Sequence, residues 1–160
     1  MKNFLNKNKG FTLLEVLFAS FIIFIFLGGI FYLLRGSIFG LTSMKNRFVA
    51  LYLAQEGIEI VKNIRDTNFL QNTSWVSGIG TGERQGDYLS ASLSDYTGAY
   101  LRQDASGFFQ YSSGSPTKFK RKITINQIDA NRIRVVVEVI WEEKGIQKNF
   151  IIFEEITKWL

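Results

Sequence analysis

The chain has 160 residues, enough for one domain of ordinary size and one membrane segment. It contains no cysteine and no histidine, which excludes disulfides, thiolate metal sites and Ser-His or Cys-His catalytic pairs. The net charge is +5, but Lys2, Lys7 and Lys9 supply three of these charges, so the remainder is not basic enough to indicate nucleic-acid binding. We therefore expect a protein that is not an enzyme and that needs no cofactor or metal.

Residues 11–34 form an apolar run whose only charged side chain is Glu15. A membrane-spanning helix needs about 20 apolar residues, so this run is predicted to cross a membrane. The basic residues before it favour a cytoplasmic N-terminus. The run is too long for a secretory signal peptide and no cleavage site of small residues follows it. A plain membrane anchor fits the length but leaves Glu15 unexplained, because a carboxylate at the bilayer centre costs about 2.5–3.5 kcal/mol.

The eight residues Lys9-Gly10-Phe11-Thr12-Leu13-Leu14-Glu15-Val16 resemble the N-terminus of type IV prepilins and of type II secretion pseudopilins. In that family a membrane-embedded prepilin peptidase removes a short basic leader after a glycine and methylates the new N-terminal amine. The resemblance implies that residues 1–10 are a cytoplasmic leader that ends at Gly10. It also implies that Phe11 becomes the N-methylated first residue and that Glu15 is the family's acidic fifth residue.

The charge on Glu15 has a physical use if the chain is cleaved in this way. Cleavage creates a cationic amine at Phe11, about one helical turn from Glu15. A buried charge is tolerable only when it is paired, so Glu15 of one subunit can meet the Phe11 amine of a neighbour in a filament. We expect Glu15 to set the register of assembly.

The helix lacks the proline that many pilins carry near the membrane end, since Pro116 is the only proline in the chain. Gly28 and Gly29 are the local weak point, each costing about 1 kcal/mol relative to alanine in a helix. They either loosen the helix in a filament or allow close helix packing through small residues.

An apolar stripe with steps of three and four follows the membrane segment and predicts that the helix continues to about Arg65. The stripe comprises Leu41, Met44, Phe48, Leu51, Ala54, Ile58, Val61 and Ile64. The stretch from Phe48 to Glu59 is similar to the second half of the long helix of minor pilins. The soluble half of this helix is expected to carry a globular domain.

The rest of the chain predicts a loop region followed by a sheet. Short strands are expected near Tyr88-Leu89 and within 108–111, and 112–116 reads as a turn or loop. Alternation then predicts strands at 122–128, 133–141 and 146–156, with a turn at 142–145. The predicted class is α+β, the pilin fold, with a long N-terminal helix on a C-terminal antiparallel β-meander. The expected segments are 1–10, 11–34, 35–66, 67–118 and 119–160.

A basic run at the start of the predicted sheet is the one charged patch. Strand alternation would place Lys118, Lys120 and Lys122 on one face. Competence-type pilins bind DNA through such surfaces, so phosphate contact is one interpretation. The other is a solvated strand face that protects an edge, where lysine is common. The acidic residues show no spacing of a calcium loop.

These patterns predict a structural subunit, a minor pilin or pseudopilin, of a filament resembling a type IV pilus. The alternative is a competence-type pilin that binds DNA. The resemblance implies four partners: the prepilin peptidase, other pilin or pseudopilin subunits, an inner-membrane assembly platform and membrane lipid. The expected location is the inner membrane, with one span and the C-terminal domain outside, and then an extracellular or periplasmic filament.

Overall fold

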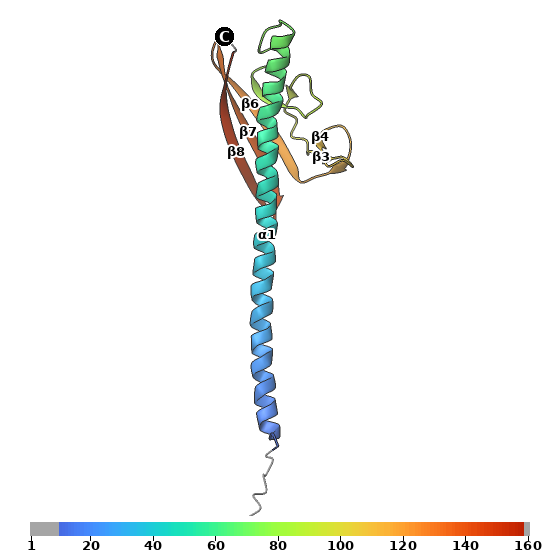
Figure 1. The fold of residues 1–160 in the computed structure, drawn as a ribbon, viewed down its shortest axis with the longest axis vertical. Helices are drawn as coiled ribbons and strands as arrows, with labels where there is room; N and C mark the ends of the chain where they lie inside the picture. The colour runs from blue at the N-terminus through green and yellow to red at the C-terminus, as the bar shows by residue number, and fades with distance from the viewer. Residues whose placement is uncertain (1–9, 159–160) are drawn as a thin grey trace, which may run out of the picture. The chain divides into compact units, whose positions relative to one another are not determined.

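The computed structural model describes residues 10–158, so residues 1–9 of the predicted leader and the last two residues lie outside the described part. The chain divides into two compact units, Met1–Thr42 and Ser43–Leu160. One helix, α1 (Leu13–Leu70), contributes to both units, and all the strands belong to the second (Figure 1). A long N-terminal helix with a C-terminal antiparallel sheet confirms the predicted α+β class and fits the pilin fold.

The first unit consists of the N-terminal part of α1, and almost all of its described side chains are exposed. This part is long and apolar enough to cross a membrane, by length and composition. Its serine hydroxyl groups are satisfied within the helix, since Ser20 Oγ donates to the Val16 carbonyl at 2.7 Å and Ser37 Oγ to the Leu33 carbonyl at 3.1 Å. Internal bonds of this kind make polar side chains compatible with a hydrocarbon environment.

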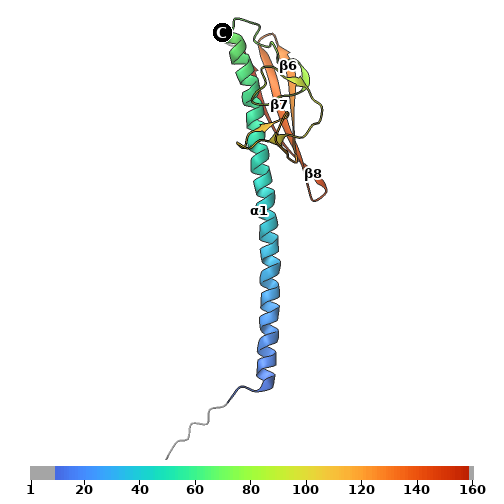
Figure 2. The same cartoon turned by 90° about the vertical axis from the view of Figure 1, so that its right-hand side faces the viewer.

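The second unit packs the C-terminal part of α1 on a five-stranded antiparallel sheet with the order β2-β1-β6-β7-β8. The strands are β1 (Gly82–Gln85), β2 (Ser94–Asp95), β6 (Phe119–Asp129), β7 (Arg132–Glu143) and β8 (Ile146–Thr157). Figure 2 shows β6, β7 and β8 side by side along this part of α1. The predicted C-terminal meander is therefore confirmed.

The turn between β7 and β8 is tighter than predicted. It consists of Lys144 and Gly145, which have φ angles of 55° and 75°, whereas Glu142 and Glu143 still belong to β7. Two consecutive residues with positive φ are typical of the turn that matches the twist of a two-stranded hairpin. The register of β7 and β8 then continues without a bulge over their whole length.

The region between α1 and β6 differs from its predicted form. Strand β1 joins the main sheet, whereas Tyr88 and Leu89 form a turn because the Asp87 carboxylate accepts bonds from the Leu89 amide and the Ser90 hydroxyl. The predicted loop around Pro116 contains a strand. A small three-stranded sheet has the order β4-β3-β5, formed by β3 (Arg102–Gln103), β4 (Phe109–Gln110) and β5 (Ser115–Pro116).

The predicted apolar stripe on α1 is only half right, and the helix ends at Leu70 rather than near Arg65. Ala54, Ile58, Val61 and Ile64 are buried in the core as expected, whereas Leu41, Met44 and Phe48 are exposed. The buried face of α1 also includes Ala50, Leu53 and Gly57, which the predicted stripe lacks. A Cβ atom on Gly57 would lie only 2.8 Å from Val137 Cγ1, so the close approach of helix and sheet requires glycine there.

Candidate functional site

The start of α1 is a capping box built by Thr12 and Glu15. Glu15 Oε2 accepts bonds from the Thr12 amide at 2.9 Å and from Thr12 Oγ1 at 3.0 Å. The Glu15 amide donates to Thr12 Oγ1 at 3.3 Å, and the Thr12 carbonyl accepts the first helical bond, from Val16. Because Thr12 is the N-cap and Glu15 the third helical residue, each side chain satisfies a backbone donor of the other.

This arrangement places Glu15 next to the predicted cleavage point. Phe11 precedes Thr12 directly and its side chain is 88% exposed. Gly10 has no atom within 4 Å of the position where a Cβ would lie, so the described chain leaves the Gly10–Phe11 bond uncovered. An amine created at Phe11 would lie one residue before the Thr12 amide, which already donates a hydrogen bond to Glu15. The carboxylate is thus oriented toward the N-terminal end of the helix, where the helix dipole favours a negative charge.

Gly28 and Gly29 lie within the uninterrupted helix α1. A Cβ atom added to either residue would meet nothing within 4 Å, so no described neighbour explains the glycines. Their predicted role in loosening the helix stays a prediction.

The predicted lysine face does not form one continuous basic surface. Lys122 Nζ lies 3.1 Å from Glu83 Oε1 and 3.2 Å from Glu138 Oε2, so two carboxylates balance its charge. These contacts raise the pKa of Lys122, mainly through the hydrogen bond to Glu83. Lys120 Nζ instead lies 4.5 Å from the centre of the Tyr100 ring, a cation–π contact.

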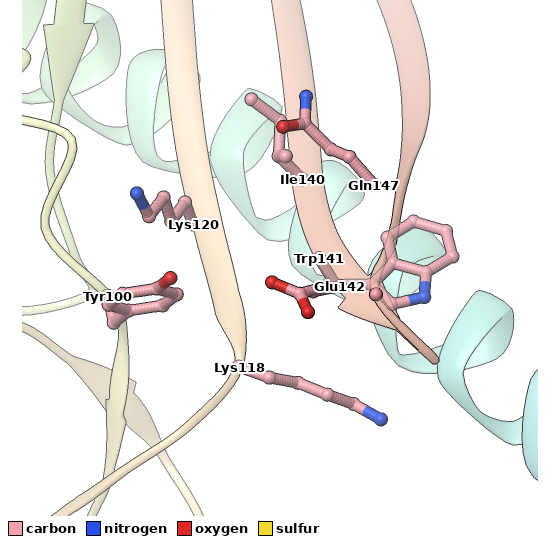
Figure 3. Close-up of a pocket in the computed structure, with 8 residues that line it drawn as sticks. Tyr100, Lys118, Lys120, Ile140, Trp141, Glu142 and Gln147 are labelled. Carbon is pink, nitrogen blue, oxygen red and sulfur yellow. The ribbon is translucent and has the colours of Figure 1, made fainter.

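Lys118 and Lys120 line an open hollow of about 240 Å³ together with Tyr100, Glu142 and Gln147. Figure 3 shows that Lys120 extends toward Tyr100 while Lys118 extends to the opposite side, with the Glu142 carboxylate between them. This geometry separates the two ammonium groups and places a negative charge beside them. It is less suited to a nucleic-acid backbone than a row of lysines with no acidic neighbour.

The most strongly connected charged residue, Arg121, was not singled out by the sequence analysis. Its side chain is fully buried. Nη1 donates to Glu56 Oε2 at 2.9 Å and to the Leu53 carbonyl at 3.1 Å, and Nη2 donates to the Gly86 carbonyl at 2.8 Å. Arg121 therefore joins β6, α1 and the segment after β1. The sequence pattern does indicate that Arg121 is buried, because strand alternation places position 121 on the same face as the apolar residues Phe119 and Ile123.

Tyr111 also forms a hydrogen bond with Arg121. Its hydroxyl donates to the Arg121 carbonyl at 3.1 Å, and burial raises the pKa of Tyr111 to about 12. Among residues 10–158 no group of three or more acidic side chains could hold a metal ion. The hydrogen bonds of Arg121 make it a structural joint between α1, β6 and the segment after β1.

Comparison with known proteins gives one match. Residues 5–31 match the family model of the prokaryotic N-terminal methylation motif, the prepilin-type signature. No curated protein and no solved structure matches the chain. The matched segment contains Gly10, Phe11, Thr12 and Glu15, the residues of the capping box and of the predicted cleavage point.

Proposed function

We propose that this chain, a pilin-like or pseudopilin-like protein by virtue of its prepilin-type motif, is a structural subunit of a filament resembling a type IV pilus. The motif implies cleavage by a prepilin peptidase and assembly with other pilins. As a filament subunit, the chain is in this proposal a minor pilin or a pseudopilin and has no catalytic activity. The long apolar helix is consistent with anchoring in the inner membrane, and we place the N-terminus in the cytoplasm and the second unit outside.

The observation that carries this proposal is the carboxylate of Glu15 in an otherwise apolar helix, held toward the N-terminal end by Thr12. A carboxylate in lipid is costly unless it is satisfied, and the capping box supplies two donors to Glu15 before assembly. In a filament the Phe11 amine of a neighbouring subunit supplies a full positive charge. A cationic amine is a stronger partner for a carboxylate than a neutral amide or hydroxyl.

The test is mass spectrometry of the N-terminus of the protein recovered from sheared filaments. We expect the chain to begin at N-methylated Phe11. The variant Gly10→Leu should remain uncleaved in the membrane, whereas Gly36→Leu should be cleaved normally, although a Cβ atom has open space at both positions. Recovery of filaments whose subunits retain residues 1–10 would overturn the proposal.

A competence-type pilin that binds DNA is the second candidate, and the cation–π pair of Lys120 and Tyr100 beside Lys118 is the observation that favours it. Substitution of Lys118 and Lys120 by alanine should then abolish DNA retention and leave filaments intact. Unchanged DNA retention would remove this candidate.

A further inference from the structure

The open hollow of about 240 Å³ lies on the face of the five-stranded sheet that points away from the core. Two cross-strand pairs contribute to it, since Lys120 is opposite Ile140 and Glu142 is opposite Gln147. Residues directly opposite each other on antiparallel strands project to the same face. Trp141 is buried, so its neighbours Ile140 and Glu142 face away from the core. The hollow is therefore built on paired strands of the second unit.

Tyr100 and Lys118 complete the hollow from two segments that backbone hydrogen bonds hold together. The Leu101 amide donates to the Phe119 carbonyl at 2.8 Å, and the Thr117 amide donates to the Leu101 carbonyl at 2.9 Å. The side chains of Leu101 and Phe119 are buried in the core. These contacts fix Tyr100 beside Lys118, so the hollow is formed before any ligand binds, as is usual for binding sites.

The charged groups of the hollow are open to a ligand. Among residues 10–158 the side chains of Lys118, Lys120 and Glu142 form no ion pair and no hydrogen bond. Lys120 Nζ contacts only the Tyr100 ring, and the Glu142 carboxylate stands between the two ammonium groups (Figure 3). An ammonium group only donates hydrogen bonds and a carboxylate only accepts them. The hollow thus offers donors and an acceptor side by side.

This combination selects the chemistry of the ligand. A phosphate group only accepts hydrogen bonds, so it suits the lysines but is repelled by Glu142. A sugar ring fits both, because each of its hydroxyl groups donates and accepts, and its apolar face can lie against Tyr100. Two lysines and one glutamate leave one positive charge in excess, which a sugar with one carboxylate would neutralise. The hollow is smaller than the about 300–1,000 Å³ of sites for drug-sized ligands, so it fits one sugar residue of a longer chain.

We propose that this hollow binds one uronic acid residue of an acidic polysaccharide. Lys118 donates to the sugar carboxylate, Lys120 donates to a ring hydroxyl, and Glu142 accepts from a ring hydroxyl. Gln147 does either, because its amide both donates and accepts. The inference goes beyond the proposed function and does not depend on it, because every lining residue belongs to the second unit. It gives the filament a ligand on the surface to which it attaches.

The experiment is calorimetric titration of the full-length protein in detergent micelles. The probes are short oligosaccharides of galacturonic acid and of glucuronic acid, the methyl esters of both, and a short oligothymidylate. The esters keep every hydroxyl group and lose only the charge. We expect at least one of the two acids to bind about tenfold more tightly than its ester, because the ester lacks the charge-assisted hydrogen bond to Lys118.

Glu142→Ala separates a sugar from a simple anion, because the two ligands respond with opposite signs. A sugar loses a hydrogen-bond acceptor, so the acid should bind about tenfold more weakly, whereas a phosphate chain loses a repulsion and should bind more tightly. Lys118→Ala should also weaken binding of the acid. Lys148→Ala is the matched control and should leave it unchanged, since Lys148 is exposed but pairs with Trp141 and so lies on the other face of the sheet.

Four results would overturn the inference. They are no binding of either acid, equal affinity for acid and ester, tighter binding of the acid by Glu142→Ala, and tighter binding of the oligothymidylate than of the acid. The last result would instead favour the competence-type candidate. None of them bears on the N-terminal mass of the filament subunit, so the proposed function is tested separately.

Discussion

The guanidinium of Arg121 and the carboxylate of Glu56 lie 2.9 Å apart, although 65 positions separate them in the sequence. Arg121 is fully buried, whereas the Glu56 side chain is 29% exposed. Removal of one partner should therefore change the stability of the second unit more than removal of the other. Removing Glu56 leaves a charge in the core, and removing Arg121 leaves a carboxylate that water can still reach.

The first prediction follows from this inequality. Glu56→Ala should lower the free energy of unfolding of the second unit by about 3–5 kcal/mol, because the buried guanidinium loses its counter-charge. Glu59→Ala is the matched control, since Glu59 is 70% exposed and its one ion pair within residues 10–158 is with Lys62, and it should cost at most about 1 kcal/mol. Urea unfolding of both variants measures the difference. Equal losses would show that the ion pair does not stabilise the joint.

The second prediction is that the second unit folds without the apolar N-terminal part of α1. A fragment that lacks the first 34 residues should be soluble and monomeric, because the core described here lies entirely between Ala50 and Ile156. Circular dichroism should show both helix and sheet, and sedimentation should give one species of monomer mass. A coil spectrum would contradict the packing of α1 on the sheet.

The third prediction tests the close approach at Gly57. Gly57→Ala should destabilise the fragment by about 1–3 kcal/mol, because the added methyl group would lie 2.8 Å from Val137 Cγ1 and 3.2 Å from Arg121 Cδ. Gly40→Ala should have no such cost, since nothing lies within 4 Å there and alanine favours a helix by about 1 kcal/mol. Thermal unfolding of the two variants is the measurement. A Gly57→Ala variant as stable as the parent would refute the packing argument.

The fourth prediction is a loss of stability in acid that depends on Glu138. Its carboxylate accepts a bond from Asn149 Nδ2 at 2.9 Å and lies 3.2 Å from Lys122 Nζ, and these contacts lower the pKa of Glu138 below its usual value of 4.5. A depressed pKa in the folded state gives stability above the unfolded pKa that is lost as the pH falls through the folded pKa. The urea concentration at the midpoint of unfolding should therefore decrease as the pH is lowered below about 4.5, and this decrease should be less steep in Glu138→Gln. An unchanged slope in that variant would exclude Glu138 as a cause.

The fifth prediction concerns assembly. Glu15→Gln should be cleaved and inserted normally but should enter filaments poorly, because the Phe11 amine of a neighbour would lose its counter-charge at a cost of about 3–5 kcal/mol. Glu15→Asp should retain part of the activity because the charge remains. The ratio of filament to membrane pool for each variant, read from sheared fractions, is the measurement. Normal incorporation of the Gln variant would show that Glu15 does not set the register.

The elements that the sequence predicts well are those with a simple period. The strands β6 and β7 alternate regularly, β8 is an apolar run that follows a short turn, and the apolar run of α1 is long enough to predict a helix across a membrane. The capping box was not predicted, although threonine three residues before glutamate is its signature. These features depend only on residues close together in the chain.

The features that were missed depend on contacts between distant segments. Which residues of α1 are buried depends on where the sheet lies: Leu53 and Gly57 are buried, whereas Met44 and Phe48 of the predicted stripe are exposed. Strand β1 has no apolar pattern of its own and exists because it pairs with β6. Arg121 was not singled out because its partner, Glu56, lies in another element.

The contacts between α1 and the sheet also have a mechanical consequence. They are spread along the helix: Ser43 contacts Glu143, Leu53 and Glu56 contact Arg121, Lys62 contacts Glu154, and Arg65 contacts the Thr157 carbonyl. Because β7 and β8 lie alongside α1, a force that pulls on the helix along its axis loads all of these contacts in shear. They must then break together rather than one after another. The second unit is thus built to resist traction applied through its N-terminal helix.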